Sequence, residues 1–531
     1  KDNKRRLTSV WDTLTQCVQL LLNTIYVNVE YIKFGDDLMN IKYQNMYIDF
    51  CIHRFFYLIL TVGQVSWCQE WTWLGGDKMI GSLSTDNHPG GRSGSSVWSS
   101  NGTVWMFGGK GFTDIGAGKS HLLNDVWSFN IHSKQFELHN SGTWTSKFDP
   151  LLHSTVVPPL RQHAAMCGHL DDIFVFGGFH EGGASLGDLW AYNTSSRIWL
   201  EHTISNSSSV GPSARGDASV WCSKSAMYLF GGIDDNRTIY SDMWKLNLSS
   251  LAWTKLHENE ESKNGCSLSY PAGRNGAATW SSGDFWYMFG GNTDSSFSYA
   301  LQRTAGLTSD LWRYHLKNNT WHVVAGAKQS DHHSVHNMIN SPHCSNIPGS
   351  RIGSAAWTNS DGNLWLFGGA GADNYPDSVR HHSKLLSDVW RFDLDVGCWD
   401  FMGGSATGET AGMYGDLGKA SQTSLPGART EMMSWSDGDN LVFIFGGLGH
   451  DENHFDGYLN DLWSVDFSMI ISREYLMSPL ILLTFFGVAS SLLMALLVLA
   501  LCSRQNQFRS GGRLQFKLSP EYYRLDSDVT V

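Results

Sequence analysis

Pro89-Gly90-Gly91-Arg92, the pair Gly108-Gly109 and the unit Asp125-Val126-Trp127 form the first of six copies of one pattern, and the last copy ends at Trp463. In every copy the glycine pair follows the arginine by 16 or 17 residues, and an Asp-x-Trp unit follows the glycines. Units of about 50 residues with such shared anchors form radial arrays, in which each unit buries one face against its neighbours. The six arginines are Arg92, Arg161, Arg215, Arg274, Arg351 and Arg429.

Each copy contains the pattern of four short strands. Small residues fill the run from Gly94 to Trp98, which suits a crowded strand near a central axis, and apolar residues fill Val104 to Phe107. A third strand begins at the Asp-x-Trp unit, and an aromatic residue nine positions after each of the first five tryptophans marks the fourth. These aromatics are Phe136, Trp199, Trp253, Trp321 and Trp399. The sequence therefore predicts an all-β fold, a six-bladed β-propeller.

The sixth copy departs from this pattern, because Ser472 stands where the fourth-strand aromatic is expected. A propeller with a strand missing would expose an open sheet edge. The segment from Gln69 to Leu74, with Trp71 and Trp73, resembles the fourth strand at Trp253 to Leu256. We therefore expect residues 69–76 to supply the outer strand of blade six and close the ring.

The six copies in phase resemble the kelch repeat, and the resemblance covers roughly residues 69–472. It implies a kelch-type propeller that binds partners through its loops. The kelch segment of attractin-type surface proteins is the nearest analogy, although this chain has no cysteine-dense module beside it. Galactose oxidase carries a copper site on a related propeller, but Tyr314-His315 falls on an expected strand and makes no convincing copper ligand set.

The flanking segments predict a membrane protein. No charged residue occurs from Tyr475 to Ser503, and basic residues follow it, which favours a C-terminal transmembrane helix at 475–503 with a cytoplasmic tail at 504–531. Residues 46–68 read as a signal peptide, and residues 1–45 are unassigned, a possible gene-model extension. We expect a single-pass type I protein of the plasma membrane or secretory-pathway membranes, with the propeller extracellular or lumenal.

Cysteines and asparagines fit that compartment. Cys266 and Cys344 occupy equivalent loops, and Cys167 and Cys222 share an inner-strand position, so each pair is a candidate bridge between blades, with free thiols as the alternative for the second pair. Six Asn-x-Ser/Thr triplets are candidate glycosylation sites. They begin at Asn101, Asn193, Asn206, Asn236, Asn247 and Asn318.

Loop lengths divide the expected propeller into two faces. The connections between strands one and two and between strands three and four are nearly constant in length, whereas the second-to-third connections and the passages between blades vary, and both of these emerge on one face. We call this the variable face and the opposite one the plain face. The longest insertions, predicted to contact a ligand, span residues 292–309, 325–346, 370–386, 403–424 and 448–460.

Two interpretations apply to the six arginines, which should surround the central opening on the variable face. Their guanidinium groups can bind the carboxylates or sulfates of a ligand. Alternatively, each pairs with a nearby carboxylate, such as the aspartate of the Asp-x-Trp unit. Both remain open at the level of sequence.

No catalytic, cofactor or nucleic-acid site is predicted. The net charge is −12 and no basic run occurs in the repeats, which argues against a phosphate-binding groove. The loops are rich in histidine, and imidazole with carboxylate can hold a divalent metal, but no spacing matches a known ligand motif. These histidines are His332, His333, His336, His343, His381, His382, His450 and His454.

The tail offers short signals. Tyr522 and Leu525 form a Tyr-x-x-apolar sorting candidate, and the end at Val531 suits a PDZ domain. Small residues recurring every fourth position from Gly487 favour a homodimer through the transmembrane helix, or else a lipid-facing stripe.

Taken together, the sequence predicts a recognition module for a protein or glycan ligand, in adhesion, receptor or cargo binding. The alternatives are a copper-dependent oxidase and, with inverted topology, an intracellular kelch adaptor.

Overall fold

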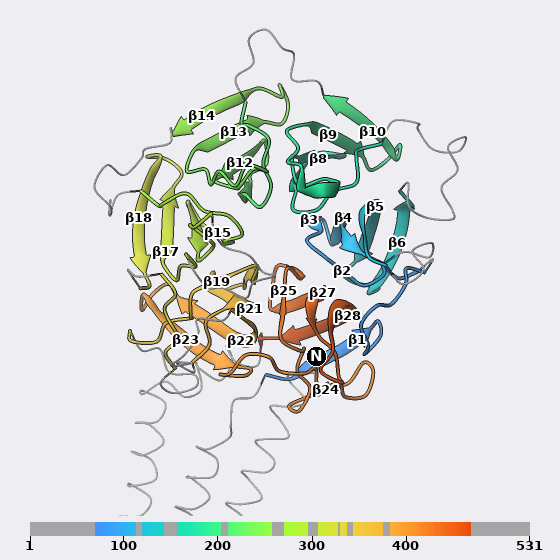
Figure 1. Cartoon of the computed structure of the whole chain (residues 1–531), viewed down its shortest axis with the longest axis vertical. Helices are drawn as coiled ribbons and strands as arrows, with labels where there is room; N and C mark the ends of the chain where they lie inside the picture. The colour runs from blue at the N-terminus through green and yellow to red at the C-terminus, as the bar shows by residue number, and fades with distance from the viewer. Residues whose placement is uncertain are drawn as a thin grey trace, which may run out of the picture. The chain divides into compact units, whose positions relative to one another are not determined.

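The computed structural model describes residues 69–85, 87–112, 119–142, 157–202, 211–257, 270–295, 306–327, 330–336, 344–374 and 383–468. Six antiparallel sheets stand around a central axis, which confirms the six-bladed β-propeller (Figure 1). Within these ranges the only helix is a short 3-10 turn at Glu181–Gly183, and none has the length and apolar character to cross a bilayer. The predicted segments 1–45, 46–68, 475–503 and 504–531 lie outside the described residues.

The blades follow one another along the chain, and each contains four strand positions counted outward from the axis. In blades one, five and six the inner position is split into two short strands. Blade one contains β2 (Arg92–Ser93), β3 (Ser96–Ser100), β4 (Thr103–Gly111), β5 (His121–Asn130) and β6 (Gln135–Asn140); blade two contains β7 (Ala165–His169), β8 (Asp172–Phe176), β9 (Leu189–Asn193) and β10 (Ile198–His202). Blade three contains β11 (Ser219–Cys222), β12 (Ala226–Phe230), β13 (Met243–Asn247) and β14 (Trp253–His257); blade four contains β15 (Ala278–Ser282), β16 (Phe285–Phe289), β17 (Leu311–His315) and β18 (Thr320–Ala325).

Blade five contains β19 (Arg351–Ile352), β20 (Ala355–Thr358), β21 (Leu364–Gly371), β22 (Lys384–Asp393) and β23 (Cys398–Gly403). Blade six contains β25 (Arg429–Thr430), β26 (Met433–Ser436), β27 (Leu441–His450) and β28 (Asp456–Asp466), with β1 (Trp71–Gly75) as its outer strand and β24 (Ala420–Ser421) beside β1.

The first strand of the described chain closes the ring, as the missing aromatic indicated. β1 runs antiparallel to β28, with Trp71 opposite Val465 and Trp73 opposite Trp463. Trp71 is 1% exposed and packs in the core between blades five and six. Blade six is therefore built from segments almost 400 positions apart in sequence, and β28 has no open edge.

The hydrophobic core lies between the blades. Separate clusters of buried side chains join each blade to the next, including blade six to blade one through residues such as Trp127, Phe129, Trp435 and Phe443. Burial of apolar surface against both neighbours is the main stabilising term of such an array. Each blade thus depends on its two neighbours around the whole ring.

The first glycine of each pair closely approaches the backbone of the next blade. All twelve glycines have positive φ, for example 64° at Gly446 and 100° at Gly447. A Cβ at Gly446 would lie 2.8 Å from the carbonyl oxygen of Arg92, and a Cβ at Gly231 would lie 2.4 Å from that of Arg274. Only glycine fits both the conformation and the contact, so the repeat of the pair reflects blade-to-blade packing.

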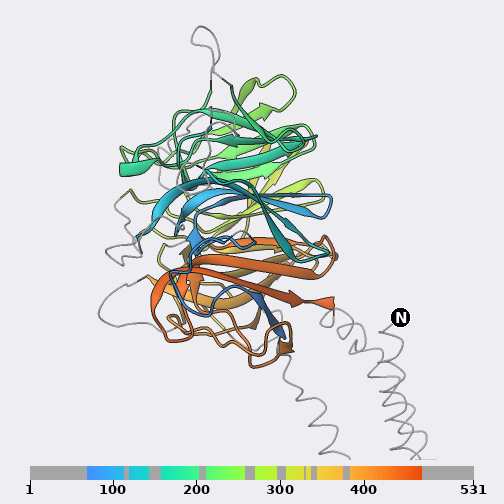
Figure 2. The ribbon, with the colours of Figure 1, turned by 90° about the vertical axis from the view of Figure 1, so that its right-hand side faces the viewer.

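Strand direction sets the two faces of the ring (Figure 2). The second-to-third connections and the inter-blade passages lie at the variable face, and the short turns lie at the plain face. In blade six, Trp71 pairs with Val465 near the end of β28, at the plain face. The described chain thus enters and leaves blade six side by side at that face.

Two disulfides are present in the described residues. Cys167 in β7 is bonded to Cys222 in β11, which confirms the expected bridge between neighbouring blades. Cys344 is bonded to Cys398 of β23, with their Cα atoms 4.8 Å apart, so the predicted pairing of Cys344 with Cys266 is wrong. Nothing in the spacing of Cys398 indicates that the passage before blade five folds back over the outer strand of that blade.

Candidate functional site

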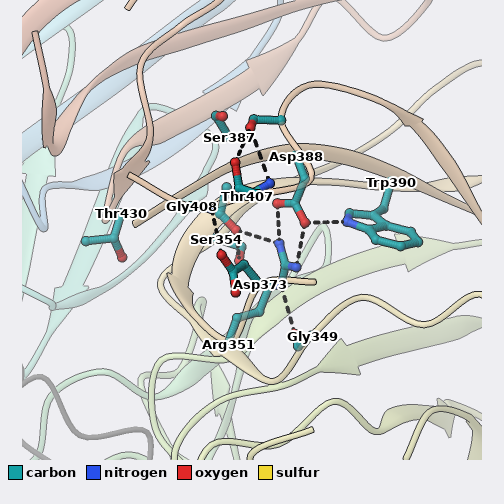
Figure 3. Close-up of polar contacts among 12 residues, drawn as sticks. Gly349, Arg351, Ser354, Asp373, Ser387, Asp388, Trp390, Thr407, Gly408 and Thr430 are labelled. Carbon is teal, nitrogen blue, oxygen red and sulfur yellow. Dashed lines mark hydrogen bonds and ion pairs between the residues drawn. The ribbon is translucent and has the colours of Figure 1, made fainter. Parts of the chain in front are cut away.

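Each repeated arginine lies at the centre of a small buried network, which Figure 3 shows for blade five. Arg351 donates from Nη1 and Nη2 to the two carboxylate oxygens of Asp388, each at 2.7 Å, and from Nε to the carbonyl of Gly349 at 2.9 Å. Its Nη1 also donates to the carbonyl of Gly368, the first of the paired glycines. Trp390 Nε1 donates to Asp388 at 2.7 Å. We call this Arg–Asp–Trp arrangement the clamp.

The clamp recurs in all six blades with the same partners. The aspartates are Asp125, Asp188, Asp242, Asp310, Asp388 and Asp461. The six arginines are 0–2% exposed. Burial alone would raise the pKa of Asp461, but the charge and hydrogen bonds of Arg429 outweigh burial and lower it.

The pairing of each arginine with its aspartate is thus confirmed. Bidentate pairing with a carboxylate occupies the guanidinium N–H donors that a ligand anion would need. Direct contact of these arginines with a ligand stays a prediction, and their burial disfavours it. The clamps fasten the start of the inner strand to the third strand of the same blade.

Two positions beyond each arginine, the backbone forms a closed circle of hydrogen bonds around the axis. The amide N–H at this position donates to the carbonyl of the same position in the preceding blade, at 2.8–3.1 Å, and blade one donates to blade six. All six residues have positive φ, between 54° and 66°. We call this circle the axial ring; its members are Gly94, His163, Asp217, Gly276, Gly353 and Glu431.

Three members of the axial ring are not glycine, and their side chains meet. His163 Nδ1 lies 2.8 Å from Asp217 Oδ1, and its Nε2 lies 3.5 Å from Glu431 Oε2. The exposed fractions of these side chains are 13%, 21% and 14%. Ser93 Oγ donates to Glu431 at 2.9 Å. The axis therefore carries a histidine held between two carboxylates; this group is called the axial triad.

The electrostatics of the axial triad favour a charged histidine. Burial lowers the pKa of His163, but the charges of Asp217 and Glu431 raise it to about 9. At neutral pH the triad is one imidazolium between two carboxylates, with a net charge of −1. Because Ser93 donates to Glu431, it is not paired with the imidazole as a nucleophile paired with its base would be.

Sequence reasoning missed the axial triad. A signal was present, because the position two residues after each repeated arginine is glycine in three blades and His163, Asp217 or Glu431 in the others. Residues other than glycine are uncommon at positive φ, and backbone strain of this kind often occurs at functional sites.

On the variable face of blade six, a buried carboxylate joins three loops. Asp451 is 0% exposed and accepts hydrogen bonds from the backbone N–H groups of Ile80, Asn453 and Phe455 at 3.4, 2.8 and 3.0 Å. Its carbonyl accepts from the N–H of Gly412 at 3.1 Å. Loops from before blade one, before blade six and within blade six are thereby held side by side.

The described histidines of the long loops have separate surroundings, apart from the stacked pair of His450 and His454. His336 stacks on Phe401 with ring centroids 4.3 Å apart, and burial lowers its pKa. His450 lies between Glu409 and Asp456 and stacks on His454. Within the described ranges, no group of three or more His, Cys, Asp or Glu side chains is arranged to hold a metal ion. His343, His381 and His382 lie outside those ranges.

The remaining candidates have separate places. Tyr314 is fully buried in β17, stacks on Trp286 and donates to Asn319 at 2.9 Å, so it is a core residue. Asn101, Asn236, Asn247 and Asn318 are exposed and Asn193 is half-buried, whereas Asn206 is not described. Tyr522 and Leu525 also lie outside the described residues.

Comparison with known proteins supports the kelch resemblance. Residues 138–340 match the family model described as the KLHDC2/KLHL20/DRC7 Kelch-repeats domain. The chain is 26% identical over 295 residues to the leucine-zipper-like transcriptional regulator 1 homolog of Drosophila melanogaster, covering 54% of this chain and 25% of that protein. It is 27% identical over 158 residues to kelch domain-containing protein 10 of Homo sapiens, covering 29% of this chain and 32% of that protein.

A further relative is the tip elongation aberrant protein 1 of Schizosaccharomyces pombe, 27% identical over 223 residues, 41% of this chain and 16% of that protein. The chain thus spans a third or less of the length of these relatives. The matched family model and kelch domain-containing protein 10 both carry the kelch name, in keeping with the six-bladed propeller.

Proposed function

We propose that this protein binds a partner protein through the variable face of blades five and six. One observation carries the proposal. Ten large apolar side chains are exposed within the described ranges, and five of them lie in the three loops that are joined at Asp451. We call these five the blade-six patch: Met79, Leu83, Met413, Leu417 and Phe455, exposed by 39–59%.

A cluster of exposed apolar side chains marks an interaction surface more often than chance exposure does. The other five exposed apolar residues lie apart, in the turns and outer strands of blades two, four and five. The long insertions predicted to contact a ligand include residues 403–424 and 448–460, which supply three members of the patch. Loops displayed by a rigid scaffold are the usual place for recognition.

The charge of these loops indicates which chemical groups the partner carries. Apart from the buried Asp451, residues 77–83, 411–419 and 450–456 together contain four exposed carboxylates and two lysines, a net charge of −2 with histidines neutral. An acidic border around apolar side chains favours a partner with apolar and basic groups, because complementary charge guides association. A protein segment supplies both groups, whereas an acidic glycan does not.

The proposal includes an extracellular or lumenal location in a type I membrane protein. The two disulfides support it, because disulfides persist in oxidising compartments and are rare in the cytosol. The uncharged segment 475–503 supports a membrane anchor. Sorting through Tyr522 and Leu525, PDZ binding and helix dimerisation belong to the same proposal and rest on sequence alone.

Proximity labelling on cells that express the full chain tests this function. We expect Phe455→Asp and Met413→Asp to remove one or more labelled surface proteins, because each places a charge in the patch. The matched control is Leu200→Asp, whose side chain in β10 is 59% exposed against 58% for Phe455. An identical set of labelled proteins for the wild type, the patch variants and the control would refute the proposal.

A further inference from the structure

The candidate glycosylation sites are unevenly placed on the propeller. Of the five described, four lie in the short turns of the plain face, one in each of blades one to four. Asn101 lies between β3 and β4, Asn193 ends β9, Asn247 ends β13, and Asn318 lies between β17 and β18. No Asn-x-Ser/Thr triplet occurs from residue 351 to residue 468, which form blades five and six apart from β1.

The fifth described triplet begins at Asn236, in the second-to-third connection of blade three on the variable face. Blade three lies across the axis from blade six (Figure 1). A modification at Asn236 would therefore stay away from the blade-six patch.

The four asparagines on the plain face differ in how far their side chains are exposed. Asn101, Asn247 and Asn318 are exposed. Asn247 uses its amide oxygen to accept from the N–H groups of Ser249 and Ser250. Asn193 is half-buried and donates from Nδ2, the atom that would carry the sugar, to Asp172 at 2.8 Å.

We propose that Asn101, Asn247 and Asn318 carry N-linked glycans, which cover the plain face of blades one, three and four and leave the variable face of blades five and six bare. The inference rests on the proposed extracellular or lumenal location. In the modification, Nδ2 attacks the anomeric carbon of a lipid-pyrophosphate-linked oligosaccharide. The N–C bond forms as the C–O bond to phosphate breaks, the nitrogen loses a proton and the lipid pyrophosphate leaves.

This arrangement assigns different roles to the two faces. Glycans are bulky and hydrated, so they would keep other proteins from the plain face, where the described chain also enters and leaves blade six. The blade-six patch would remain open to a partner. Modification and recognition are thereby separated by the thickness of the propeller.

The test uses the full chain expressed in cells with a secretory pathway. Asn101→Gln, Asn247→Gln and Asn318→Gln are compared by electrophoresis before and after treatment with an N-glycosidase, and occupied sites are mapped by mass spectrometry. We expect each variant to lose one glycan. Thr103→Ala and Thr320→Ala should lose the same glycan as the asparagine variants, while Thr103→Ser and Thr320→Ser should keep it.

Two negative results have different meanings. Glycans at Asn206 or Asn236 with none at the three proposed sites would overturn the inference and leave the proposed location intact. No glycan anywhere, together with protease accessibility of the propeller from the cytosolic side of sealed vesicles, would overturn the location as well.

Discussion

The clamps and the axial ring are separated by two residues in every blade, yet they behave in opposite ways. The clamp is the same six times, with a buried arginine, an aspartate and a tryptophan in matching geometry. The axial ring keeps its backbone hydrogen bonds but changes its side chains, from glycine to His163, Asp217 and Glu431. Exact repetition therefore marks what holds the ring together, and departure from it marks what distinguishes this propeller.

The largest effect is expected from breaking one clamp. Arg429→Met leaves Asp461, which is 0% exposed, without its counter-charge in the core. Loss of one partner of a buried pair costs about 3–5 kcal/mol in the free energy of unfolding. Urea denaturation followed by tryptophan fluorescence measures it. Lys419→Met is the control, because its pair with Asp416 is exposed on both sides and its loss should leave the midpoint unchanged. Equal midpoints for the two variants would refute the structural role of the clamp.

The axial triad predicts a loss of folding stability that depends on pH. The pKa of His163 is raised to about 9 in the folded protein, against 6.5 for an ordinary histidine. The stabilisation is complete below pH 6.5 and is lost as pH rises through 9. The pKa of Asp217 is lowered in the folded protein. The stability that its carboxylate contributes is therefore lost at acid pH, as the pH falls through that lowered pKa. We expect His163→Gln to reduce the free energy of unfolding by up to about 3 kcal/mol at pH 6, since one unit of pKa is worth about 1.4 kcal/mol.

The comparison between wild type and His163→Gln at pH 6 and pH 9.5 measures this effect, because the cost of glutamine at positive φ is the same at both pH values. His336→Gln is a control of opposite sign. Burial lowers the pKa of His336, so that histidine destabilises the wild type as pH falls below 6.5. A loss at His163 that does not change with pH would mean that the triad holds no charged histidine.

The glycine pairs predict an intermediate effect. Gly446→Ala should cost more than the about 1–2 kcal/mol that positive φ costs an ordinary residue, because its Cβ would lie 2.8 Å from the carbonyl of Arg92. Gly397→Ala is the matched control, since Gly397 has φ of 75° and no heavy atom lies within 4 Å of the added Cβ. The difference between their denaturation midpoints measures the close contacts at Gly446, which are with the carbonyl of Arg92 in blade one and that of Leu459 in β28. Equal losses would mean that the backbone is not tightly packed around Gly446, where blade six meets blade one.

Repetition also explains how much the sequence could predict. Blade number, the strand pattern and the closing strand at Trp71 followed from anchors in phase, because spacing along the chain maps directly onto a radial array. The clamp was one of two interpretations, since sequence cannot tell whether an arginine faces solvent or an aspartate. The bond between Cys344 and Cys398 and the meeting of three loops at Asp451 were missed, because both depend on how irregular loops fold back in space.

The smallest effect on stability should occur in the blade-six patch. Phe455 is 58% exposed, and only its backbone N–H contributes to the network of Asp451. Phe455→Asp should therefore change the free energy of unfolding by no more than about 0.5 kcal/mol, as exposed substitutions usually do. Phe445→Asp in the same blade is the contrast, because that side chain is 0% exposed and its charge would be buried without a partner. If Phe455→Asp unfolds the propeller as Phe445→Asp should, the patch belongs to the scaffold. If it leaves stability intact and abolishes surface labelling, the division between repeated framework and variable binding face holds at the level of single side chains.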